Sequence, residues 1–166
     1  MNGIRLALLL GMLGVTSALQ AQTTPPALSD VDSAPAPVPY LPSIADLMTS
    51  SVQPRHVKLG LAVQYGNWAY AAYETNELRG AVNRIIRTIP VYDRKMNTES
   101  LMAMILPPLD LLDTAIKAKD GAGARRAFSA LTATCNACHQ QTLNRNYIVI
   151  VDPKATVFPN QDFRHH

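Results

Sequence analysis

The stretch Cys135-Asn136-Ala137-Cys138-His139 lies in the last amphipathic segment of this chain. Apolar or small side chains recur there at steps of four, three, four, three and four, at Ala124, Phe128, Leu131, Cys135, Cys138 and Thr142. This spacing is that of one face of an α-helix. Both cysteines therefore belong to the face that the helix turns toward a protein core.

The same five residues have the spacing of a haem-attachment motif, C-x-x-C-H. Thiols three residues apart on a helix lie one turn from each other, so Cys135 and Cys138 can both bind one flat macrocycle through thioether bonds. The adjacent His139 can bind the iron as its proximal ligand. We expect one covalent haem c per chain.

The cysteine pair has three other interpretations. A thioredoxin-like dithiol is the main alternative, although no βαβ pattern surrounds the motif. A zinc site would need more ligands at close spacing, and the chain has no other cysteine. A disulfide between positions three apart on a helix would be strained.

Three more amphipathic segments precede the motif helix. They run from Ser43 to about Tyr65, from Trp68 to about Thr88, and from Thr98 to about Ile116. Pro54 should kink the first, and Pro107-Pro108 should bend or split the third, because proline removes a donor and clashes with the preceding turn. Four such segments with short connections favour an all-α fold, an antiparallel four-helix bundle with covalent haem near the C-terminal end of the last helix.

Capping residues mark several helix ends. Ser43 with Asp46 can cap the first helix. Gly66 suits a left-handed helix end, and Asn67 can cap the second helix.

The polar connection from Val91 to Asn97 carries no strand signal. The run Tyr147-Ile148-Val149-Ile150-Val151 is β-branched, has no obvious pairing partner, and should lie extended across the bundle.

The N-terminus predicts export. Arg5 is followed by an apolar run of about ten residues and then by small residues, the pattern of a secretory signal peptide over residues 1–21. An uncleaved membrane anchor is the alternative, but the run is well short of the roughly 20 residues that span a bilayer. We therefore expect a periplasmic protein with no stable membrane insertion after signal cleavage.

The remaining sequence divides by composition. Residues 22–42 are rich in proline, which favours extended, solvated backbone, and predict a linker. Residues 43–146 would form the haem bundle, and residues 147–166 an extended C-terminal tail. The formal net charge is +3. The lysine and arginine residues of the chain are scattered and do not form the basic stripe that is typical of nucleic-acid binding.

With these features the chain resembles the class II c-type cytochromes, the cytochrome c′-like proteins, over roughly Ser43 to Arg145. The resemblance implies an exported four-helix bundle with Cys135 and Cys138 as attachment residues and His139 as proximal ligand. It also implies that the first helix faces the far side of the haem, and it allows a homodimer. The long tail after the motif departs from the family, in which the chain usually ends soon after it.

The sixth iron position is left open by the sequence. His56 lies within about 50° of the centre of the first helix's apolar stripe and is the leading candidate for a distal ligand. Met48, Met102 and Met104 are alternatives, and an iron without a sixth protein ligand is another. His165 and His166 are terminal and are expected to be mobile.

Other polar residues have weaker signals. Arg55 and Lys58 could pair with haem propionates, because guanidinium and ammonium groups suit carboxylates. Glu74 and Glu77 look like a solvated face. The chain shows no carboxylate dyad, nucleophile motif or phosphate-binding loop, so we do not expect an enzyme.

These features predict an electron carrier, whose iron cycles between ferric and ferrous states and whose partners are other redox proteins. A gas-binding or sensing protein with an open iron site is the second hypothesis. A peroxidase-like enzyme is the least supported, because no distal acid–base group can be named.

Overall fold

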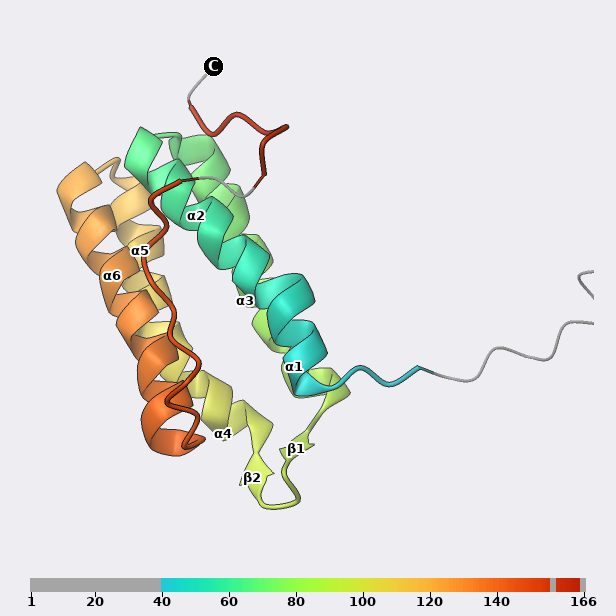
Figure 1. Ribbon diagram of the computed structural model, residues 1–166. Helices are drawn as coiled ribbons and strands as arrows, with labels where there is room; N and C mark the ends of the chain where they lie inside the picture. The colour runs from blue at the N-terminus through green and yellow to red at the C-terminus, as the bar shows by residue number, and fades with distance from the viewer. Residues whose placement is uncertain (1–39, 156–157, 165–166) are drawn as a thin grey trace, which may run out of the picture. The chain divides into compact units, whose positions relative to one another are not determined.

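The computed structural model describes residues 40–155 and 158–164 (Figure 1). The expected signal peptide, nearly all of the expected linker, and His165 and His166 lie outside the described residues. No helix in the described part is both long and apolar enough to cross a membrane.

The described residues are mostly helical, which confirms the all-α class. The elements are α1 (Ile44–Leu47), the π-helical segment η2 (Met48–Val52), α2 (Gln53–Tyr65), α3 (Trp68–Thr88), β1 (Val91–Tyr92), β2 (Met96–Asn97), α4 (Thr98–Met102), the 3₁₀ turn η3 (Ala103–Ile105), α5 (Leu106–Lys117), α6 (Gly121–Ala137) and the π-helical segment η4 (Cys138–Thr142).

The first helical stretch begins as the sequence predicts. Ser43 Oγ accepts a hydrogen bond from the Asp46 amide at 3.1 Å, and the Asp46 carboxylate accepts one from the Ser43 amide at 2.8 Å. This reciprocal pair satisfies two amides at the helix start. The irregularity expected at Pro54 takes the form of η2, and Pro54 itself lies in the first turn of α2, where its missing N–H has little cost.

The end of α2 and the start of α3 also agree with the sequence prediction. Gly66 ends α2 in the left-handed conformation with φ of 67°. The Asn67 side chain then caps α3 by accepting a hydrogen bond from the Tyr70 amide. The third predicted helix is split at η3 into α4 and α5, and Pro107 and Pro108 lie in the first turn of α5.

The connection between α3 and α4 differs from the sequence prediction. β1 and β2 pair antiparallel, with Val91 opposite Asn97 and Tyr92 opposite Met96. Asp93 and Arg94 both have positive φ, the backbone conformation of a tight hairpin turn. Strands of two residues are too short to give an alternating pattern, so the sequence carries no signal for them.

The helices pack around one core. α2 contacts α3 and α6, and α5 contacts α3 and α6. The predicted apolar stripes are buried in this core, among them Leu59, Val63, Leu78, Val82, Ile85, Leu109, Leu112, Ile116, Phe128 and Leu131. Burial of apolar side chains is the main favourable term in the folding of such a bundle.

The segment after η4 has no regular secondary structure, and it runs back along α6 and α2 (Figure 1). The Asn136 side chain bonds both the N–H and the C=O of Ile150, each at 2.8 Å. Farther along, the Pro153 carbonyl accepts a hydrogen bond from Gln64, and Phe163 is buried. These contacts tie the tail to α6 first and to α2 and α3 later.

Two glycines provide a matched test of this packing. A methyl group at Gly60 in α2 would come within 2.5 Å of Phe128 Cζ and 2.6 Å of Pro153 Cγ, whereas one at Gly80 in α3 would meet nothing within 4 Å. We expect Gly60→Ala to lower the free energy of unfolding by about 1–2 kcal/mol through overpacking. Gly80→Ala should raise it by about 0.5–1 kcal/mol through helix propensity. Urea unfolding of both variants measures the difference, and equal shifts would contradict the close approach at Gly60.

Candidate functional site

A cavity lies between the first helical stretch and the motif helix. Its volume is about 170 Å³, which is far more than one water molecule needs. It is lined by Ile44, Ala45, Met48, Thr49, Val52, Gln53, His56, Tyr92, Met102, Ile105, Cys135, Cys138, His139, Leu143, Arg145, Ile148 and Ile150. Most of these side chains are apolar, so the cavity suits a largely apolar ligand with a few polar groups.

The structure brings all four predicted site residues to this cavity. Cys135 lies at the end of α6, Cys138 and His139 lie in η4, and His56 comes from α2. Cys138 and His56 are buried, and Cys135 and His139 are partly exposed. Segments η2 and η4 both contribute to the lining, and π-helical turns of this kind are frequent at functional sites.

The two cysteines are free thiols that are hard to ionise. Burial raises the pKa of Cys135 to about 11, with a smaller contribution from the nearby Cys138. Burial also raises the pKa of Cys138. A dithiol redox site needs a thiol whose pKa is lowered so that the thiolate forms near neutral pH. The shifts here are in the opposite direction and disfavour the thioredoxin-like alternative.

The ring of His139 is oriented by the tail. Its Nδ1 lies 3.3 Å from the carbonyl oxygen of Ile148. A carbonyl oxygen can only accept a hydrogen bond, so Nδ1 carries a proton, and in the neutral form of the ring Nε2 is the nitrogen with the lone pair. Histidines that bind metals usually donate the other ring N–H in this way, which fixes the tautomer that can bind.

His56 is 4% exposed and packs against Phe128, with ring centroids 4.7 Å apart. Burial lowers the pKa of His56 to about 4, partly opposed by the charge of Asp152, so the imidazole is neutral near pH 7. Its Nε2 lies 2.9 Å from Thr132 Oγ1. A neutral imidazole on the cavity wall can serve as an iron ligand or as a hydrogen-bond partner for a bound molecule.

The three methionines that the sequence offers as sixth iron ligands differ in whether they line the cavity. Met48 from η2 and Met102 from α4 both line the cavity, whereas Met104 does not. Met102 is also part of the buried core, at 1% exposure. Apolar methionine packing is sufficient to account for the burial of Met102.

One arginine side chain lines the cavity, and it is neither of the two cations that the sequence suggested. Arg145 lines the cavity and donates a hydrogen bond to Tyr92 Oη at 2.5 Å. Within the described residues it has no carboxylate partner. Arg55 and Lys58 are absent from the lining: Arg55 forms ion pairs with Glu74 and Glu77, and the Lys58 ammonium lies over the Phe158 ring.

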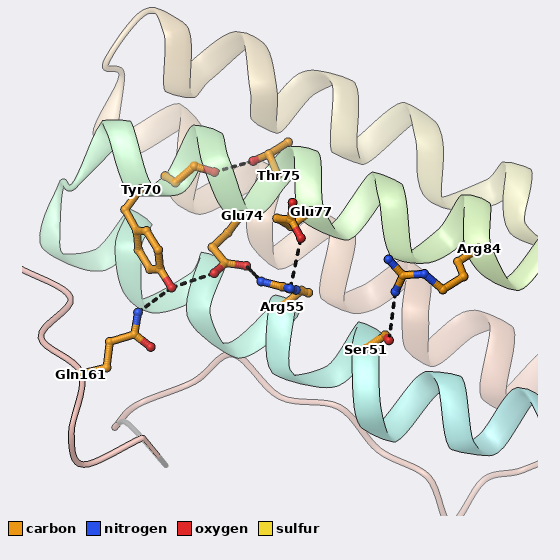
Figure 2. Close-up of polar contacts among 9 residues, drawn as sticks. Ser51, Arg55, Tyr70, Glu74, Thr75, Glu77, Arg84 and Gln161 are labelled. Atoms are coloured by element: carbon orange, nitrogen blue, oxygen red, sulfur yellow. Dashed lines mark hydrogen bonds and ion pairs between the residues drawn. The ribbon is translucent and has the colours of Figure 1, made fainter. Parts of the chain in front are cut away.

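The expectation that Glu74 lies on a solvated face is wrong. Its side chain is 1% exposed, and its carboxylate contacts Arg55 at 3.3 Å and accepts a hydrogen bond from Tyr70 Oη at 2.7 Å (Figure 2). Gln161 of the tail donates to Tyr70 Oη at 2.6 Å. Glu74 lies one helical turn before Leu78 on the buried stripe of α3, and the tail covers its hydrogen-bond partner Tyr70.

Sequence reasoning missed Thr132, Asp152, Arg145 and Tyr92 as site residues. Each of them acts through a contact that spans at least 20 positions in the chain, and such contacts leave no local pattern. The only available signal was the β-branched run at residues 147–151, whose Ile148 and Ile150 line the cavity.

Comparison with protein families, with curated proteins and with solved structures finds no match for this chain. Within residues 40–155 and 158–164, no group of three or more histidine, cysteine or acidic side chains could hold a metal ion. A haem iron takes its equatorial ligands from the porphyrin, so one or two protein ligands are enough for it.

Proposed function

We propose that this protein is an exported electron carrier, an antiparallel four-helix bundle with one haem c attached near the C-terminal end of its last helix. The observation that supports this proposal best is the convergence of Cys135, Cys138 and His139 on one largely apolar cavity, with His56 on its wall. The raised thiol pKa values weigh against a dithiol enzyme with the same two cysteines.

In this proposal each residue has a defined role. Cys135 and Cys138 form the thioethers, and His139 binds the iron through Nε2 while Nδ1 donates to the Ile148 carbonyl. The apolar wall excludes water from the ligand. When bound, haem supplies one-electron chemistry, with a potential that depends on axial ligands, burial and nearby charge. The expected location is the periplasm, and the expected partners are redox proteins and, in a homodimer, a second copy.

Expression in a host with a c-type maturation system tests the proposal. The purified protein should show a Soret band, and the haem should remain with the polypeptide in acid acetone. A protein without a Soret band, or one that releases its haem in acid acetone, would overturn it.

One observation favours the gas-binding alternative. His56 Nε2 is engaged by Thr132, so this nitrogen is not free to close the sixth iron position. Rapid CO binding by the ferrous protein, together with a high-spin ferric spectrum, would support an open site. A low-spin spectrum in both oxidation states would support electron transfer.

The substitution His56→Ala separates these two functions. If His56 is the distal ligand, its removal should convert a low-spin, six-coordinate spectrum to a high-spin one. The reason is that alanine offers no lone pair to the iron. Absorption spectra of the ferric and ferrous forms are the measurement. An unchanged spectrum would show that His56 is not an axial ligand, and His139→Ala provides the comparison for loss of the proximal one.

A second expected result concerns Arg145. If its guanidinium lies near the haem carboxylates, Arg145→Met should lower the reduction potential, since a nearby positive charge favours the reduced state. We expect a shift on the order of 59 mV, which is about 1.4 kcal/mol for one electron. Exposed Arg126 on α6 does not line the cavity, so Arg126→Met is the control in the same redox titration. Equal potentials for both variants would contradict the placement of Arg145.

A further inference from the structure

A chain of hydrogen bonds leads from the tail to the cavity. Asp152 in the tail accepts from the hydroxyl of Thr132 at 2.6 Å through Oδ1, and from the hydroxyl of Ser129 at 2.5 Å through Oδ2. Thr132 Oγ1 in turn lies 2.9 Å from His56 Nε2. The chain thus joins α2, α6 and the tail at one buried threonine, which is 6% exposed.

The single proton of the Thr132 hydroxyl decides which group donates in each of these hydrogen bonds. The Thr132 hydroxyl has a single proton and three polar neighbours within reach: the Asp152 carboxylate, the Phe128 carbonyl at 3.2 Å and the His56 ring. The shortest contact is to the charged carboxylate, which accepts most strongly. With its proton committed there, Oγ1 can only accept from His56.

His56 must therefore carry its proton on Nε2. In a neutral imidazole the other nitrogen, Nδ1, then has a bare lone pair. His56 lines the cavity, and among the described residues Nδ1 has no hydrogen-bond partner. Contact with the Phe128 ring at 4.7 Å restricts rotation of the imidazole out of this arrangement.

The tail thus sets the tautomers of both histidines, and in opposite senses. The Ile148 carbonyl keeps the proton of His139 on Nδ1, so His139 offers Nε2. The Asp152 carboxylate, four residues later, keeps the proton of His56 on Nε2 by way of Thr132. Asn136 fixes the intervening Ile150 by two hydrogen bonds, which holds both acceptors in register with α6.

We propose that Asp152 and Thr132 are positioning residues that hold His56 as the Nε2–H tautomer, so that Nδ1 is the atom His56 offers to the cavity. A bare imidazole nitrogen in an apolar cavity binds either a metal or the hydrogen of a ligand's donor group. If the ligand is haem, which rests on the function proposed above, His56 would bind iron, or hydrogen-bond an iron ligand, through Nδ1.

The tautomer can be read directly by nitrogen NMR. The sample is the haem-loaded protein with ¹⁵N-labelled histidine, in the ferrous state under CO, which keeps the iron diamagnetic. Long-range ¹H–¹⁵N correlations should show a protonated Nε2 and an unprotonated Nδ1 for His56. A spectrum with the proton on Nδ1 would overturn the proposal without any substitution.

Two variants then test the role of the hydroxyl. Thr132→Val removes Oγ1 at nearly constant volume, and we expect the ratio of Nε2–H to Nδ1–H tautomers to fall by about tenfold. Thr132→Ser keeps the hydroxyl and should keep the wild-type ratio. Equal ratios in wild type and both variants would show that Thr132 does not act on His56. Should the valine variant fail to fold, the wild-type spectrum still decides the tautomer.

This test is independent of the cofactor. The Soret band and acid acetone extraction report whether haem is attached, and the histidine correlations report the tautomer in protein with or without haem. A protein that lacks haem but shows Nε2–H on His56 would remove the proposed function and keep the positioning role. A haem protein with Nδ1–H on His56 would keep the proposed function and remove the positioning role.

Discussion

Replacing both Cys135 and Cys138 by serine is expected to abolish covalent haem completely. Serine has nearly the volume of cysteine but no sulfur to form a thioether, so the cavity should stay formed while the attachment is lost. The protein from a maturation-competent host would then release any haem into acid acetone. The measurement is the absorbance of the protein fraction at the Soret band after extraction.

The single variants give the graded result. Cys135→Ser or Cys138→Ser leaves one thiol and should leave one thioether, so haem remains bound with one vinyl group intact and with a shifted pyridine haemochrome band. Thr134→Ser is the matched control, because Thr134 precedes the motif and does not line the cavity. Full haem retention by the double variant would mean that another group holds the cofactor. A redox titration of the two thiols would then test the dithiol interpretation.

Helix ends were predictable because they depend on neighbouring residues. The Ser43–Asp46 pair, left-handed Gly66 and the Asn67 cap all satisfy backbone groups within a few positions, and each occurs where the sequence places it. Pro107 and Pro108 likewise divide the third helix by local geometry. Such features need only the preferences of single residues and their near neighbours.

The cavity was predictable only in part. The helical period of α6 was enough to place Cys135 and Cys138 on an inward face, and the period of the first helix was enough to place His56. The orientation of each imidazole, however, depends on the tail acceptors Ile148 and Asp152. Their approach follows from the path of an irregular segment, and that path has no periodic signal in the sequence.

Glu74 shows a different limit, in which charge was given more weight than helical period. On a helical wheel Glu74 lies one turn before Leu78, on the stripe that α3 buries, so its position indicates burial although its charge suggested a solvated face. No local signal in the sequence predicts the tail that covers its partner Tyr70, whose ring centroid lies 5.9 Å from that of Phe163 and whose hydroxyl accepts from Gln161. A charge enclosed in this way requires a partner, and Arg55 is the cation that supplies it.

Replacing Arg55 by methionine should therefore destabilise the fold. Methionine keeps much of the apolar stem but leaves the enclosed Glu74 carboxylate with only its hydrogen bond from Tyr70. Removing one member of a fully buried pair costs about 3–5 kcal/mol. Because the Arg55 side chain is 30% exposed, we expect a smaller loss, about 2–3 kcal/mol in the free energy of unfolding. Urea unfolding followed by circular dichroism measures it.

Two comparisons identify the cause of that loss. Arg84 donates to Ser51 from an exposed position on α3 (Figure 2), so Arg84→Met should change the free energy of unfolding by less than about 0.5 kcal/mol. Adding Glu74→Gln to Arg55→Met removes the enclosed charge and keeps an acceptor for Tyr70. The double variant should therefore regain about 1–2 kcal/mol over the single one. If it is instead less stable than Arg55→Met, the loss comes from the packing of the arginine stem, because an uncompensated carboxylate predicts recovery and packing does not.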